Sequence, residues 1–172
     1  MKNGLSLFFV VLFVGFGYSQ TKLKAFKNSE ISLKYPKTWQ KFGAMGYVYI
    51  MPKIVKRNTF ENEVEHVSVN KNVINYDGVQ DVKEIISNYS NTLSRNEAEK
   101  KFKISKIEGN SKFIYKVEYL IRYNFTETVY KRLEVFFQNG NTLENYRYQM
   151  REDLFDKYYD DAMLIINSIE KR

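Results

Sequence analysis

The stretch Phe113–Phe125 reads FIYKVEYLIRYNF and carries an apolar residue at every second position, seven over thirteen positions. That period is typical of a β-strand with one buried face. The alternation resumes over Val129–Phe137, and the short Thr126-Glu127 link between the two predicts a hairpin. Asn139-Gly140 then predicts a tight turn into a returning strand, Leu143–Met150. These segments predict an antiparallel meander at the centre of the fold.

Further strands and two helices are expected on either side of this meander. The pattern predicts strands near residues 31–35, 47–51, 64–74 and 102–104. Apolar residues at helical spacing predict one helix from about residue 79 to 96, with Asp77 and Gln80 as a capping box. A second helix is expected from about residue 152, with Lys171 and Arg172 at its end. The predicted class is α/β (α+β): a mostly antiparallel sheet of about six or seven strands flanked by helices.

The N-terminus has the pattern of an export signal. Lys2 precedes the apolar run Leu5–Phe16, which is too short to span a bilayer, and Gly17 and Ser19 are small residues at a cleavage position. We expect residues 1–19 to be a cleavable signal peptide and residues 20–172 to form a single domain. The alternatives are an uncleaved anchor and a buried core helix. The expected location is exported, either periplasmic or secreted.

The amino-acid composition excludes several kinds of functional site. It contains no cysteine, which excludes disulfides, thiol catalysis and cysteine-bound metal or iron–sulfur sites. The net charge is +7 at pH 7, and the signal carries one of these charges on Lys2. Because lysines are scattered among acidic residues, we interpret the charge mainly as surface charge, with an anionic partner as the alternative. No nucleic-acid module is visible, so no nucleic-acid partner is expected.

Several short motifs resemble the PsbP-like family. Ile31-Ser32-Leu33-Lys34-Tyr35-Pro36 followed by Trp39 is similar to that family's opening strand, which ends in Tyr-Pro-x-x-Trp. Val67-Ser68-Val69 matches its next strand, and Ile165-Ile166-Asn167-Ser168-Ile169 is similar to its closing helix. The resemblance spans about residues 30 to 169. It implies an α/β/α sandwich and a non-catalytic binding or assembly role, but it carries over no functional residue.

The candidates for a catalytic or metal site lie around His66, and each has a simpler structural interpretation. His66 is the only histidine, and a nucleophilic triad would need it as the base. Glu61, Glu63 and Glu65 stand close to His66 in sequence and would form a metal site only if all four side chains converged. On a strand, alternation would turn His66 away from these glutamates. We therefore expect no catalytic residue, no metal and no cofactor.

The favoured function is a non-enzymatic accessory or binding protein of the cell envelope. Its expected partner is an unidentified envelope protein, and any membrane contact is expected to be peripheral at most. The candidate contacts lie in the polar segment after Pro52: Lys53, Lys56, Arg57, Glu61 and Glu63. The alternative is a carrier that holds a lipid or other apolar ligand between sheet and helix. The oligomeric state is left open.

Overall fold

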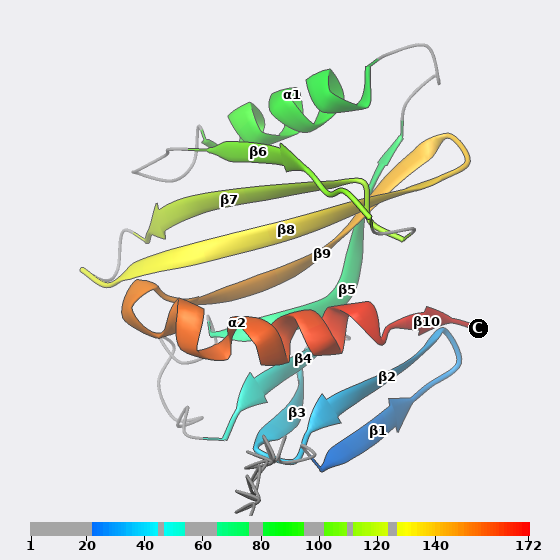
Figure 1. Ribbon diagram of the computed structural model, residues 1–172, viewed down its shortest axis with the longest axis vertical. Coiled ribbons are helices and arrows are strands. Elements are labelled where there is room, and N and C mark those ends of the chain that lie inside the picture. The colour runs from blue at the N-terminus through cyan, green and yellow to red at the C-terminus, as the bar shows by residue number, and fades with distance from the viewer. Residues whose placement is uncertain are drawn as a thin grey trace, which may run out of the picture.

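In its described residues, the chain forms two antiparallel β-sheets and two α-helices (Figure 1). The computed structural model describes residues 22–44, 47–53, 65–75, 81–94, 102–109, 112–123 and 127–172. The small sheet contains β1 (Leu23–Lys27), β2 (Ile31–Pro36) and β10 (Glu170–Lys171), in the order β1-β2-β10. The two helices are α1 (Val82–Ser94) and α2 (Glu152–Asn167).

The large sheet has seven strands, in the order β3-β4-β5-β9-β8-β7-β6. They are β3 (Trp39–Ala44), β4 (Tyr47–Pro52), β5 (His66–Asn75), β6 (Lys103–Lys106), β7 (Tyr115–Arg122), β8 (Val129–Asn139) and β9 (Thr142–Arg151). All strand pairs in both sheets are antiparallel. The predicted mixed class and the central meander are therefore confirmed.

Alternation along the central strands divides the core between the two faces of the large sheet. On β8, Leu133, Val135 and Phe137 belong to the core around α2, whereas Phe136 belongs to the core under α1. Figure 1 shows α1 on one side of the large sheet and α2 on the other, with the small sheet beyond α2. The helix α2 is thus enclosed between two sheets, which explains why its apolar surface is wide.

Helix α1 begins later than predicted. Asp77 and Gln80, the expected capping pair, lie outside the described residues. The described helix starts after Asp81, whose Oδ1 accepts a hydrogen bond of 2.9 Å from the backbone N–H of Lys83. This is the usual bond of an N-cap side chain. The apolar stripe is positioned as predicted, because Ile86 is fully buried against the sheet.

The C-terminal end of α2 also differs from expectation. The helix ends at Asn167, and its last turn contains no basic residue. Lys171 lies beyond it, in β10, so it does not interact with the helix as predicted. Instead, Lys112 donates from its ammonium group to the carbonyl oxygens of Ile166 and Ile169. A cation at this end satisfies carbonyls that lack helical partners and opposes the negative end of the helix dipole.

The hairpin between β8 and β9 is shifted by one residue from the prediction. Asn139 pairs directly with Thr142, so the two loop residues are Gly140 and Asn141. Gly140 has a φ of 57°, in the left-handed region that glycine tolerates best. The glycine is therefore required by the turn, but as its first residue.

Three strands were not predicted: β1, β3 and β10. The predicted strand over residues 31–35 is β2, which belongs to the small sheet, and β3 occupies the edge of the large one. None of the described helices has both the length and the apolar character needed to cross a bilayer.

Candidate functional site

Of the predicted contact residues, only Lys53 lies within the described part of the chain. Lys56, Arg57, Glu61 and Glu63 lie outside it, so their prediction is untested. Lys53 follows β4 and is exposed, and its backbone N–H donates to the carbonyl of Thr38 at 2.9 Å. That bond places Lys53 beside the turn between β2 and β3.

Glu65 and His66 have separate surroundings. Glu65 is buried, and its Oε1 lies 2.9 Å from Nε of Arg151 at the end of β9. The ring of His66 contacts the edge of Tyr49, with 4.4 Å between the ring centroids. In the described residues no three histidine, aspartate or glutamate side chains gather as potential metal ligands. Glu65 is therefore engaged as an ion-pair partner of Arg151.

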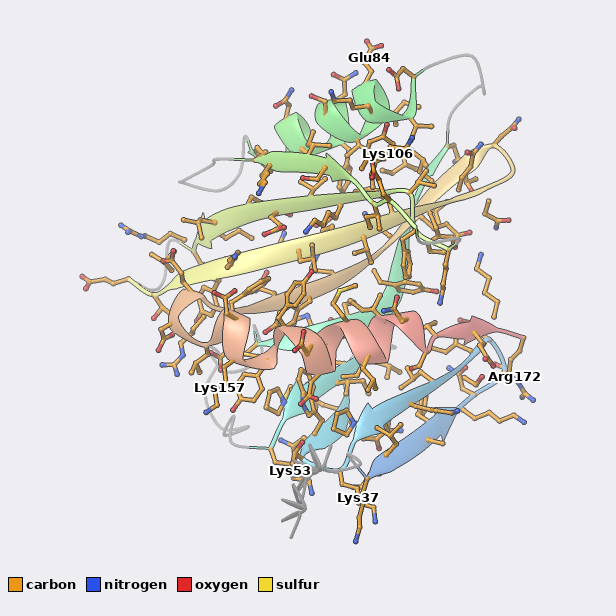
Figure 2. All side chains as sticks on the ribbon, viewed as in Figure 1. Lys37, Lys53, Glu84, Lys106, Lys157 and Arg172 are labelled. Atoms are coloured by element: carbon orange, nitrogen blue, oxygen red, sulfur yellow. The ribbon has the colours of Figure 1, made fainter. Side chains whose placement is uncertain are left out.

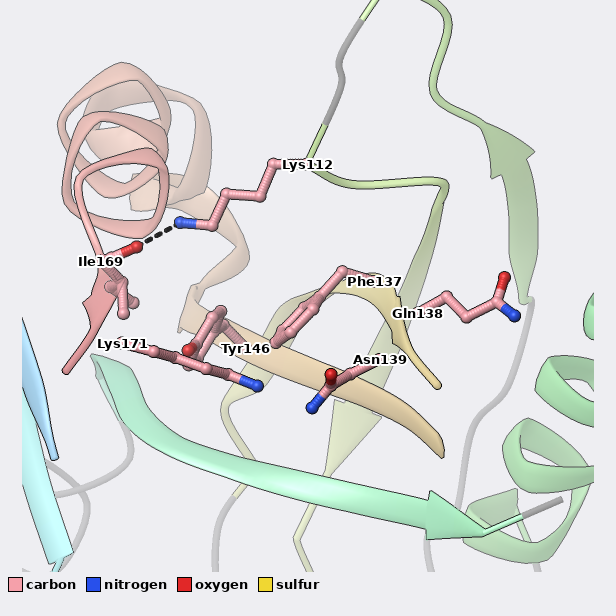
Figure 3. A pocket seen from close by; sticks show the side chains of 7 residues that line it. All are labelled: Lys112, Phe137, Gln138, Asn139, Tyr146, Ile169 and Lys171. Carbon is pink, nitrogen blue, oxygen red and sulfur yellow. Dashed lines mark hydrogen bonds between the residues drawn. The ribbon is translucent and has the colours of Figure 1, made fainter. Parts of the chain in front are cut away.

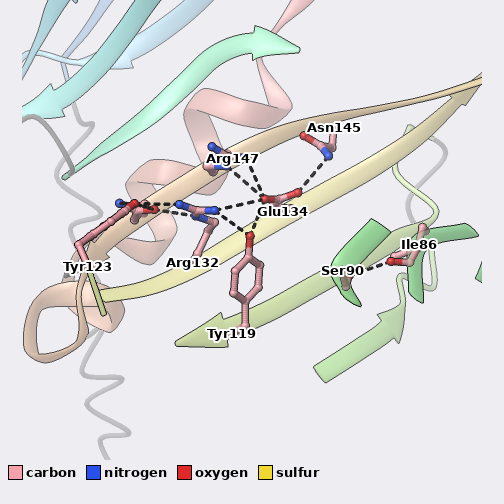
Figure 4. Close-up of polar contacts among 9 residues, drawn as sticks. Ile86, Ser90, Tyr119, Tyr123, Arg132, Glu134, Asn145 and Arg147 are labelled. Carbon is pink, nitrogen blue, oxygen red and sulfur yellow. Dashed lines mark hydrogen bonds and ion pairs between the residues drawn. The ribbon is translucent and has the colours of Figure 1, made fainter. Parts of the chain in front are cut away.

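A buried polar network on the α1-facing side of the large sheet is the most unusual feature of the core (Figure 4). Glu134 on β8 is fully buried, and it accepts hydrogen bonds from Tyr119 (2.8 Å), Asn145 (3.0 Å) and Arg147 (3.2 Å). Arg132 donates to the Tyr119 hydroxyl at 2.9 Å. The hydroxyl of Tyr119 thus links Arg132 and Glu134 of β8.

The network extends from Arg132 along the sheet toward the end of β7. Arg132 donates through Nε to Gln149 at 2.6 Å and through Nη2 to Tyr123 at 2.9 Å. Tyr123 and Gln149 are also hydrogen-bonded to each other, at 3.1 Å. Because Tyr119 and Arg132 are directly opposite in the register of β7 and β8, the antiparallel pairing itself brings the network together.

Electrostatic interactions in the network keep the protonation states of Tyr119 and Arg147 constant near neutral pH. Burial and the negative charge of Glu134 together raise the pKa of Tyr119. Burial alone would lower the pKa of Arg147, but the charge of Glu134 raises it overall. Tyr119 therefore stays protonated and Arg147 stays charged near neutral pH, so neither group is suited to general acid–base chemistry. Two guanidinium groups around one carboxylate instead make a rigid polar layer within the sheet.

A shallow pocket of about 200 Å³ opens between the end of α2 and the β8–β9 hairpin (Figure 3). Phe137, Tyr146 and Ile169 supply its apolar lining, and Lys112 and Lys171 stand at its sides. Lys171 is paired with Glu144 at 2.8 Å, and Lys112 with the carbonyls at the end of α2. Both ammonium groups are therefore already engaged by neighbours in the fold, Lys171 by a carboxylate and Lys112 by backbone carbonyls.

The positive charge of the chain is concentrated in one region, contrary to the scattered distribution inferred from the sequence. Residues 22–53 contain seven lysines and a single acidic residue, Glu30, which accounts for six of the seven net charges, and Lys2 supplies the other. All seven side chains are exposed. We call them the lysine surface: Lys22, Lys24, Lys27, Lys34, Lys37, Lys41 and Lys53.

Several basic residues elsewhere in the described chain contact acidic partners. Lys116 and Lys131 contact Glu118, Arg147 contacts Glu134, and Arg151 contacts Glu65. Residues 54–172 contain equal numbers of basic and acidic side chains. The lysine surface is thus a local excess of charge on β1–β4, and Figure 2 shows Lys37 and Lys53 together at the end of the molecule opposite Glu84 and Lys106.

Two solved structures resemble this chain in fold. The cyanobacterial PsbP protein CyanoP from Synechocystis sp. PCC 6803 has a TM-score of 0.57 and 14% sequence identity, covering 91% of this chain and 96% of CyanoP. LpqN, involved in cell envelope biogenesis of Mycobacterium tuberculosis, has a TM-score of 0.50 and 10% identity, covering 87% of this chain and 90% of LpqN. No family model and no curated protein matches the sequence. The resemblance expected from the Tyr-Pro-x-x-Trp and Ile-x-x-Ser-Ile motifs is confirmed at the level of architecture: the chain has a PsbP-like fold.

Proposed function

We propose that this protein is a non-catalytic, exported accessory protein of the cell envelope that acts by binding another envelope component. The observation that carries the proposal is the lysine surface. Exposed like charges that repel one another lower the stability of a fold, so a local excess of one charge is favoured where it meets a partner of opposite charge. The proposal places the working surface on β1–β4 and on the segment that follows Lys53.

The chemistry of the described residues supports a binding role over catalysis. The buried network holds Tyr119 and Arg147 in protonation states that do not change near neutral pH. The single histidine, His66, contacts the Tyr49 ring. The two structures of similar fold are named as a PsbP protein and a protein of envelope biogenesis, and neither name describes an enzyme.

A carrier of apolar ligands is less well supported. In the described residues, the space between α2 and the two sheets is filled by large side chains that include Trp39, Tyr146, Tyr148 and Phe155. The pocket at the end of α2 is open, and its volume of about 200 Å³ is below the several hundred Å³ of ordinary ligand cavities. A lipid chain would have to displace these packed rings.

The protein contact is proposed in the segment after Lys53, where Lys56, Arg57, Glu61 and Glu63 stand. A photoreactive side chain introduced at Lys56 of the exported protein in intact cells should yield one cross-linked protein of defined mass. The matched control carries the same group at Lys83, an exposed position on α1. The proposal is wrong if position 56 captures nothing, or captures the same mixture as position 83.

A further inference from the structure

We propose that the lysine surface docks the domain on an anionic phospholipid membrane. This inference deepens the proposed function, because it names the surface on which the accessory protein works. Its first support is the kind of residue present: all seven basic side chains of residues 22–53 are lysines, and none is an arginine. Flexible ammonium groups suit the diffuse charge of a headgroup layer, whereas arginine is the residue for bidentate recognition of single carboxylates or phosphates.

The second support is the geometry of the small sheet. Leu33 and Tyr35 of β2 are buried toward α2, so Lys34 faces the opposite, outer side. The register of β1 and β2 places Ala25 opposite Lys34, and Lys27 opposite Ser32, on that same outer side. Leu23 shares this side and is one of two large apolar residues that stand exposed in the described chain. An exposed leucine among lysines is the composition of a surface that rests at a membrane interface.

The third support is the position of the lysine surface relative to the N-terminal apolar run. Lys22 follows Phe16 by six residues, a reach of at most about 20 Å even for extended chain. The backbone N–H of Lys37 donates to the carbonyl of Lys22 at 2.8 Å, so the β2–β3 turn lies beside the same point. While Leu5–Phe16 is in the membrane during export, this end of the domain is therefore next to the headgroups.

An acidic protein is the competing occupant of the same surface. Lys27 and Lys34 lie on the outer side of the small sheet, and Lys37 and Lys53 lie at the turns at its end. This spread favours a broad array of charge over a single binding pocket. Each lysine near an anionic surface contributes a roughly fivefold gain in binding. Several together therefore suffice to hold a domain on a membrane at physiological ionic strength.

The test uses the mature chain, residues 20–172, and vesicles that float in a density gradient. Wild-type protein should float with vesicles of phosphatidylglycerol and phosphatidylcholine, remain unbound with phosphatidylcholine alone, and be released by 0.5 M salt, because salt screens the attraction. The triple variant Lys27→Gln, Lys34→Gln, Lys37→Gln should bind on the order of a hundredfold more weakly. The matched variant Lys83→Gln, Lys103→Gln, Lys106→Gln loses the same charge from α1 and β6, and should lose less than about threefold, as only long-range attraction changes.

Equal losses in the two variants would overturn the proposal, because net charge alone would then explain binding. Failure of the wild type to float would also overturn it, as would salt-resistant binding to phosphatidylcholine. Circular dichroism and melting temperature confirm that both variants are folded. No protein partner is present in this assay, so its failure is distinguishable from failure of the cross-linking test at position 56. If the vesicle test fails and the lysine-surface variant loses the cross-linked protein, the surface binds protein instead.

Discussion

Trp39, at the start of β3 in the large sheet, contacts α2 both through its ring and through its indole N–H. It is fully buried, its Nε1–H donates to Asp161 at 2.8 Å, and its ring packs edge-on against Tyr158. Trp39→Ala should lower the free energy of unfolding by about 3–5 kcal/mol, since it removes a large buried ring and leaves a cavity. Urea unfolding measures this loss, and a value below about 1 kcal/mol would contradict the packing described.

Glu134 is the only carboxylate placed among Tyr119, Arg132, Asn145 and Arg147 in the described network. Glu134→Gln should therefore cost about 3 kcal/mol, because it leaves two guanidinium groups without their buried counterion. The matched control is Glu118→Gln on β7, whose contacts with Lys116 and Lys131 are partly exposed. It should cost at most about 1 kcal/mol. Equal costs in urea unfolding would show that the network is not electrostatically coupled.

We expect the contribution of Glu65 to stability to change with pH in the opposite direction to that of most carboxylates. Burial raises its pKa above the ordinary 4.5, and the charge of Arg151 offsets only part of this effect. The native state therefore binds more protons than the unfolded state between 4.5 and the raised pKa, so this group's contribution to stability falls as pH increases through that window. The stability of the wild type relative to Glu65→Gln should decrease from pH 4 toward neutral pH and then level off. A difference that increases over the same range would contradict this assignment.

At the scale of elements, the contacts of Ser168 explain why the closing motif carries a serine before its last isoleucine. Its hydroxyl oxygen accepts a hydrogen bond from the backbone N–H of Lys34 at 2.8 Å, and the hydroxyl lies 2.7 Å from the carbonyl of Ile165. One side chain thus ties the end of α2 to the middle of β2. Ser168→Ala should lower the melting temperature and cost about 1 kcal/mol. Asn167→Ala, one residue earlier and exposed, is the control and should change stability by less than about 0.5 kcal/mol.

The local pattern of apolar residues predicted the long strands, but it missed the strands that are defined by pairing with residues distant in sequence. The strands β7, β8 and β9 alternate clearly and form the meander that was predicted. β1 is almost entirely exposed and gives no alternating signal, and β10 has only two residues, so each is defined by pairing with β2. β3 contains Gly43 and a charged residue, and it is recognised only by its register with β4. Such strands acquire their structure from tertiary contacts rather than from intrinsic propensity.

The buried network was missed because its sequence signal resembles that of a solvated face. Arg132 and Glu134 alternate with Leu133 and Val135, which normally indicates a strand with one wet side. The one available clue was that polar residues also alternate on the returning strand, at Asn145, Arg147 and Gln149. The polar faces of two adjacent central strands can hydrogen-bond to each other where the register places their side chains side by side. Their burial therefore becomes visible only in the three-dimensional structure.

At the scale of the whole molecule, most of the excess positive charge lies in one part of the chain, residues 22–53. Several charges of the meander are paired, as Glu144 is with Lys171 and Arg151 with Glu65. The lysine surface carries the excess and is held to α2 by Trp39 and Ser168. Substitutions of these lysines should therefore change binding with little effect on the fold.

The last prediction concerns the processing that would expose this surface. Leu5–Phe16 followed by Gly17-Tyr18-Ser19 predicts cleavage after Ser19, so the exported protein should begin at Gln20 or Thr21. Cleavage there would remove Lys2 and leave all seven lysines of the lysine surface within a few residues of the new N-terminus or in the folded domain. Intact-mass measurement of the protein recovered from the envelope tests this directly. A membrane-bound product whose mass still includes residues 1–19 would contradict cleavage and show that the apolar run is a permanent anchor. In that case the apolar run would hold the lysine surface at the membrane. Neither high salt nor loss of the lysines would then release the protein.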